Sequence, residues 1–174
     1  LWGLSRVSDQ HRFRFDYLYS DVGARPAFAD ELEGRGSSFF GVTPRRASPL
    51  RNRQDLHTLF AEHDFDILHF HANTASYVAP VRAALDRGIH VIYHSHNTGA
   101  RSRATRSLHR LNRVLLPWQR ISRVAVSDAA GLWMFGGEDY EVIHNGVDID
   151  TFAFQAHTRI ETRRLLGISD ETFV

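Results

Sequence analysis

The 174-residue chain contains no cysteine and no lysine. Without cysteine it can form neither a disulfide nor a thiolate metal site. All 21 basic residues are arginines, and 20 acidic residues bring the formal charge to +1. Because nucleic-acid-binding domains usually carry a basic excess, this near-balance gives no reason to expect a nucleic-acid partner.

Long apolar runs are also absent. No run approaches the roughly 20 residues that span a bilayer. The first residues are too rich in charge for a secretory signal, with Arg6, Asp9, Arg12 and Arg14 close together. We therefore expect a cytoplasmic protein, peripheral at the inner face of the plasma membrane if it meets a membrane at all. The chain begins with Leu1 rather than Met, and we expect a fragment truncated at both ends.

Short apolar runs alternate with amphipathic segments along the whole chain. The hydrophobic content of 43% suits one domain with a sizeable core. Strands are predicted near residues 14–19, 38–42, 65–71, 91–93, 123–126 and 142–144. Helices are predicted near residues 26–33, 49–63, 76–87, 105–119, 128–135 and 158–166. This alternation predicts an α/β fold, a doubly wound parallel sheet with helices on both faces.

Two of the predicted strands end in the same way. Residues 65–74 (FDILHFHANT) and 90–98 (HVIYHSHNT) each carry a His-x-His pair, followed soon by Asn and Thr. Residues two apart on a strand face the same side, and ligands of open α/β sheets bind beyond the carboxyl ends of the strands. Imidazole, amide and hydroxyl groups carry no fixed charge, and they donate and accept hydrogen bonds. They therefore suit a ligand that has many hydroxyl groups. The residues expected to bind substrate here are His71, Asn73, Thr74, His94, Asn97 and Thr98.

The same two pairs raise the question of a metal site. Histidine pairs alone do not fix a coordination sphere, and Asn73 and Asn97 stand where a carboxylate ligand would help. We predict no metal and no resident cofactor, and keep a metal hydrolase as an alternative that zinc analysis would test. We also expect at least one of the four histidines to be buried and hydrogen-bonded to the backbone.

Residues 101–123 form a second unusual segment. They carry seven arginines, and no Asp or Glu occurs from Asn97 to Ser127. The helix predicted at 105–119 is expected to turn its apolar side chains inward, namely Leu108, Leu111, Val114 and Leu115. Two interpretations of the charge remain open: a solvated helix face, or attraction to the phosphates of an anionic membrane or lipid-phosphate substrate. No stacking aromatics are interleaved with the arginines, so nucleic acid is not expected.

Five motifs, taken in order, resemble the N-terminal half of a family 4 glycosyltransferase of the GT-B fold, closest to bacterial enzymes of capsular or exopolysaccharide assembly. They are residues 65–71, 94–98, 125–129, 133–136 and 142–148. The resemblance implies metal-independent transfer of a sugar from a nucleotide-sugar donor to a saccharide or lipid-linked acceptor, with retention of configuration. It implies a catalytic position for His96, near the transferred sugar, and places Ser127 near the donor phosphates. Asn145, Gly146 and Asp148 would bind substrate and lead into the domain crossing.

The resemblance also implies how the chain is divided. Residues 1–150 would form an acceptor-side Rossmann-like domain whose first strand and glycine-rich loop lie before Leu1. Residues 151–174 would form an interdomain segment and the start of a C-terminal domain. The spaced glutamate pair of that second domain has no counterpart here, so the chain alone is expected to be inactive. A sugar-nucleotide epimerase of the same fold and a non-catalytic binding fragment are the alternatives.

Overall fold

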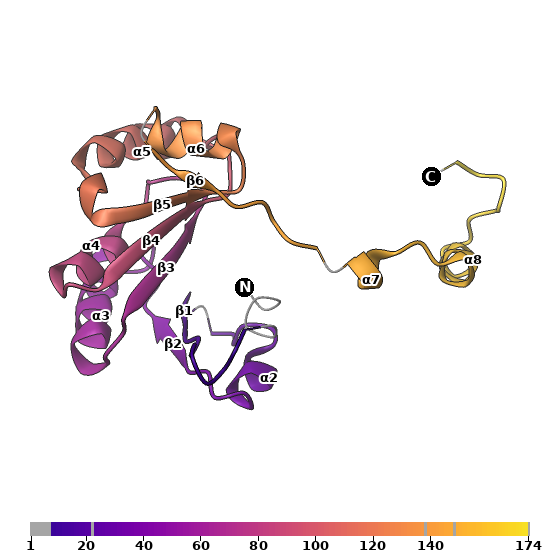
Figure 1. Ribbon diagram of the computed structural model, residues 1–174, viewed down its shortest axis with the longest axis horizontal. Coiled ribbons are helices and arrows are strands. Elements are labelled where there is room, and N and C mark those ends of the chain that lie inside the picture. Colours follow the sequence, from indigo (N-terminus) through magenta and orange to yellow (C-terminus); the bar gives the residue numbers. More distant parts are fainter. Residues whose placement is uncertain (1–7, 22, 138, 148, 174) are drawn as a thin grey trace. The chain divides into compact units, whose positions relative to one another are not determined.

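The computed structural model describes residues 8–21, 23–137, 139–147 and 149–173. The chain divides into two compact units, Leu1–Ile143 and His144–Val174 (Figure 1). No helix within the described residues is long and apolar enough to cross a bilayer.

Two parallel sheets frame the larger unit. One is a pair of short strands, β1 (Tyr17–Ser20) and β2 (Phe39–Val42). The other has four parallel strands in the order β3 (Ile67–Ala72), β4 (His90–Ser95), β5 (Ile121–Ala125) and β6 (Glu141–Val142). Parallel neighbours need crossover connections, and most of these contain a helix.

The helices of the larger unit are α2 (Ala29–Glu33), α3 (Pro49–Glu62), α4 (Ala79–Asp86), α5 (Arg103–Leu115), the short 3₁₀ helix η1 (Trp118–Arg120) and α6 (Asp128–Phe135). Three of these helices have a serine as N-cap: Ser48 for α3, Ser102 for α5 and Ser127 for α6. The hydroxyl of each serine accepts a backbone N–H of the first helical turn. The predicted α/β fold with parallel sheets flanked by helices is confirmed (Figure 1).

Within its described residues, the smaller unit holds the helices α7 (Ile149–Phe152) and α8 (Ala156–Leu165). Its one buried charged side chain is that of Arg163, among the described residues. The Arg163 guanidinium donates to the carbonyls of Ser169 and Thr172, and so ties the segment after α8 back onto the helix.

The two sides of β4 have different surroundings, because alternate residues of a strand point to opposite sides. Val91, Tyr93 and Ser95 are fully buried and point toward the helices. Tyr93 packs edge-on against Phe135 of α6, and the Ser95 hydroxyl donates to the Ala130 carbonyl of α6 at 2.9 Å. The opposite side of β4 therefore carries the alternate residues, among them His94.

Candidate functional site

Four histidines at the carboxyl ends of β3 and β4 form one group, here called the histidine cluster: His69, His71, His94 and His96. His71 and His94 are direct partners in the parallel ladder. Nδ1 of His71 lies 2.7 Å from Nε2 of His96, and Nε2 of His69 lies 3.1 Å from Nδ1 of His94. Two imidazole–imidazole hydrogen bonds thus join the ends of the two strands.

Burial keeps these imidazoles uncharged. Burial, and then the neighbouring imidazoles, lower the pKa of His71 to about 3 and that of His94 to about 4. The pKa values of His69 and His96 are lowered too, again chiefly by burial. The cluster is therefore neutral near pH 7, and each ring offers one donor and one acceptor.

The ring contacts correct one expectation from the sequence. A backbone partner was expected for at least one of the four histidines. Within the described residues, each ring is instead hydrogen-bonded to another histidine of the cluster. The backbone groups beside them are already paired in the β3–β4 ladder, so the rings are left to bond to one another.

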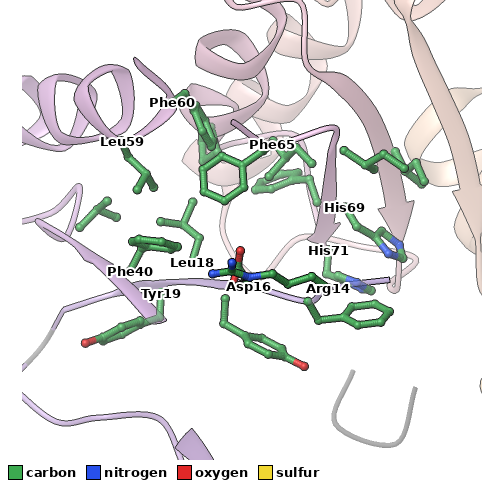
Figure 2. Close-up of a pocket in the computed structure, with 18 of the residues that line it drawn as sticks. Arg14, Asp16, Leu18, Tyr19, Phe40, Leu59, Phe60, Phe65, His69 and His71 are labelled. Atoms are coloured by element: carbon green, nitrogen blue, oxygen red, sulfur yellow. Dashed lines mark hydrogen bonds and ion pairs between the residues drawn. The ribbon is translucent and has the colours of Figure 1, made fainter. Parts of the chain in front are cut away.

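A cavity of about 490 Å³ lies beside the cluster. It is lined from β1 and from β3, so that His69 and His71 form part of one wall. Figure 2 shows Leu18, Phe40 and Phe60 on its apolar side. The histidine cluster is thus reached from a largely apolar hollow.

Four polar residues that follow β3 and β4 are called the polar rim: Asn73, Thr74, Asn97 and Thr98. The Thr74 hydroxyl bonds to that of Ser76 at 2.9 Å, and Asn97 Oδ1 accepts the Thr98 N–H at 2.8 Å. Asn73, Asn97 and Thr98 are exposed. The structure therefore brings the rim and the cluster to the same edge of the sheet.

The remaining predicted site residues are placed differently. Ser127 follows β5 at the same sheet edge, and its hydroxyl accepts the Ala130 N–H as the N-cap of α6. Asn145 and Gly146 are exposed residues of the smaller unit. Asp148 lies outside the described residues.

Two residues of α5 that sequence reasoning missed hold the loop after β3. Buried His109 accepts the Ala75 N–H through Nδ1 at 3.0 Å, and its Nε2 lies 3.2 Å from the Trp133 carbonyl. Asn112 donates to the Ala75 carbonyl at 2.7 Å. Both backbone groups of Ala75 are thus bound to α5. His109 and Asn112 are three apart and share a helix face, but nothing in that spacing identifies Ala75 as their partner.

The prediction that the apolar side chains of α5 turn inward is wrong. They are exposed, with 46% of Leu108, 55% of Leu111, 83% of Val114 and 56% of Leu115 accessible. The inward side is occupied by His109 and Asn112, which satisfy the backbone of Ala75. Any rotation that buried the leucines would break these bonds.

Six of the seven arginines in residues 101–123 fall into two groups. Arg113 and Arg120 donate to backbone carbonyls, those of Trp133 and Leu85. Four others are exposed, and no described acidic side chain forms an ion pair with them: Arg101, Arg103, Arg106 and Arg110. The outer face of α5 therefore combines unpaired positive charge with exposed apolar side chains.

The structure bears on the metal question as well. One ring nitrogen from each of His69, His71 and His94 lies within 4.8 Å of the others. A three-histidine arrangement of this kind is open to an ion without a carboxylate.

Comparison with known families gives one match. The model of Glycosyltransferase Family 4 matches residues 3–151, which include the histidine cluster, the polar rim and Ser127. A search of curated proteins finds no match.

Proposed function

The chain belongs to Glycosyltransferase Family 4, and we propose that it is the N-terminal part of an enzyme that transfers a sugar from a nucleotide-sugar donor. The acceptor would be a saccharide or a lipid-linked saccharide of cell-surface polysaccharide synthesis. Family membership supports a glycosyltransferase-type function in general. The parallel α/β fold is consistent with the Rossmann-like half of a GT-B enzyme.

The observation that carries the proposal is the uncharged histidine cluster at the carboxyl ends of β3 and β4. Neutral imidazoles both donate and accept hydrogen bonds, as sugar hydroxyls require. The polar rim adds amide and hydroxyl groups at the same edge, where open α/β sheets bind their ligands. The apolar hollow beside β3 would accommodate the less polar part of an acceptor.

Within this site we assign His96 the position nearest the transferred sugar. It directly follows β4, is less buried than His94, and is hydrogen-bonded to His71. That bond fixes the orientation of the His96 ring, so its free nitrogen can meet a substrate hydroxyl. Donor contacts of Ser127, Asn145, Gly146 and Asp148 stay predictions from the family resemblance.

The outer face of α5 supports a lipid-linked acceptor. Leu108, Leu111 and Leu115 are spaced to form one stripe of a helix. Arg103, Arg106 and Arg110 form a second stripe, about 140° further round the helix axis. Both stripes are exposed. A basic helix with an exposed apolar stripe binds anionic bilayer surfaces by charge and by burial of apolar area. We therefore propose that α5 contacts an anionic membrane.

Saturation-transfer NMR with a panel of common monosaccharides and disaccharides tests the sugar site. We expect the 174-residue chain to show contacts to at least one panel member and the His96→Ala variant to lose most of that signal. His90→Ala is the matched control, because His90 lies on the same strand but is exposed and bonded to Ser122. Equal signals from the His96 variant and the unaltered chain would count against the assignment.

Sedimentation with lipid vesicles tests the membrane contact. The chain should pellet with vesicles that contain phosphatidylglycerol and stay in solution with pure phosphatidylcholine, because the attraction is largely electrostatic. Added salt should release it as screening increases. Equal binding to both kinds of vesicle would contradict the proposed role of the arginines.

A further inference from the structure

We propose that His69, His71 and His94 together bind one first-row divalent transition metal ion, such as Zn²⁺. This site goes beyond sugar transfer and does not depend on it. It rests on the placement of three ring nitrogens, on two buried nitrogens without a partner, and on an access path. The three observations are independent of one another.

The backbone brings the three rings together. Paired strand positions hold His71 against His94, and His69 lies two residues earlier on the same side of β3. One nitrogen from each ring lies within 4.8 Å of the other two. A tetrahedral zinc ion with Zn–N bonds of about 2.0–2.1 Å needs its nitrogens about 3.4 Å apart. The rings would therefore have to turn toward the ion as it binds.

Two of the nitrogens are otherwise unexplained. Nε2 of His71 and Nε2 of His94 are buried and have no hydrogen-bond partner within the described residues. Buried polar groups normally have partners. The Nδ1 atoms of the same two rings are already engaged, with Nε2 of His96 and with Nε2 of His69. An N–H on each Nδ1 leaves the lone pair on Nε2 free to bind an ion. When the ion binds, His69 exchanges its hydrogen bond from the His94 N–H for a bond from its Nε2 lone pair to the metal.

The donor set selects the class of ion. All three ligands are imidazoles, which suit zinc, copper and nickel, whereas magnesium and calcium take oxygen ligands. His69 and His71 also line the 490 Å³ cavity, so an ion can reach the site from solvent. His94 lies behind them and is 8% exposed. The fourth coordination position is left for water or for an incoming ligand.

Calorimetric titration of the EDTA-stripped 174-residue chain with zinc chloride tests the proposal. We expect saturation at one ion per chain and no heat with magnesium chloride. His71→Ala and His94→Ala should each weaken zinc binding by at least about tenfold, since even outer-shell changes at metal sites cost 10–100-fold. His90→Ala should bind as the unaltered chain does, because His90 bonds to Ser122 outside the cluster. Elemental analysis after gel filtration checks the stoichiometry.

Two further measurements keep the test decisive if an alanine variant fails to fold. His71→Gln and His94→Gln keep a polar side chain, and circular dichroism reports whether each variant folds. Cobalt added to the unaltered chain should give the visible absorption of a tetrahedral site, and zinc should displace it. The proposal is overturned if the unaltered chain shows no saturable zinc binding, or if folded His71 and His94 variants bind zinc as tightly as it does.

Discussion

The histidine cluster and helix α5 both concentrate nitrogen-bearing side chains, and they present them in opposite ways. In the cluster, neutral imidazoles from two strands turn toward one another and form hydrogen bonds. On α5, the guanidinium groups of Arg103, Arg106 and Arg110 turn to solvent, whereas uncharged His109 and Asn112 turn inward. The cost of removing charge from water explains the difference, because a buried group must be neutral or paired. On α5, the fully buried titratable side chain is accordingly His109, which can be neutral.

Among the tests of this difference, His109→Ala is expected to have the largest effect, a loss of folding stability. The substitution removes two hydrogen bonds at a fully buried position and leaves the Ala75 N–H without its partner. We expect a loss of about 2–4 kcal/mol in the free energy of unfolding, from the unsatisfied groups and the cavity. Urea denaturation followed by circular dichroism measures it. Exposed Arg106→Ala should stay within about 0.5 kcal/mol, and a similarly small loss for His109→Ala would show that the inner polar face of α5 is unimportant.

Removing two arginines from the outer face should have the next largest effect. Each arginine near an anionic bilayer contributes about 1 kcal/mol. Arg106→Ser combined with Arg110→Ser should therefore weaken binding to phosphatidylglycerol vesicles by about 30-fold. The same double change at Arg82 and Arg87, which are exposed at α4, serves as the control. If both double variants lose affinity equally, the membrane contact is not specific to α5.

Acid should destabilise the metal-free chain through the cluster. The folded-state pKa values of His71 and His94 are about 3 and about 4, below the ordinary value of 6.5. The neutral rings therefore contribute stability above pH 6.5, and this stability is lost as the pH falls from 6.5 toward those values. The urea midpoint should fall steadily across this range in the presence of EDTA. His71→Gln should flatten the dependence, and an equally steep dependence in that variant would assign the effect to other groups.

Leu111→Ser is expected to have the smallest effect. Leu111 is 55% exposed, so the free energy of unfolding should change by less than about 0.5 kcal/mol. Leu56→Ala, at a fully buried position of α3, should cost about 2–5 kcal/mol in the same urea experiment. A decrease of more than about 2 kcal/mol in the free energy of unfolding for Leu111→Ser would indicate that Leu111 is buried, as the sequence predicted.

The side of the sheet that a strand residue faces was easier to predict from the sequence than the side of a helix that packs inward. Residues two apart on a strand must share a side, so each His-x-His pattern was enough to predict that its own two histidines face the same way. The capping of α3 and α6 by Ser48 and Ser127 is local in the same sense, because each serine bonds within the first turn of the helix that it precedes. The site residues after β3 and β4 follow from where parallel strands end.

The orientation of α5 could not be predicted in this way. The spacing of its apolar residues predicted that they face inward. The side that packs is instead set by hydrogen bonds from His109 and Asn112 to Ala75, which lies 34 residues before His109 and 37 before Asn112. The bonding of the histidine rings to each other likewise depends on the register of β3 against β4. Both features are contacts between distant segments, and local patterns carry no information about them.

The hydrogen bonds from α5 to Ala75 fix the position of the loop after β3 relative to this helix. Ala75 belongs to the loop that follows the polar rim residues Asn73 and Thr74, and both of its backbone groups are bonded to the helix. In the proposed membrane contact, these bonds would hold the loop at a fixed distance from the lipid headgroups. The length of the linker in the proposed lipid-linked acceptor would then decide whether its sugar hydroxyls reach the polar rim.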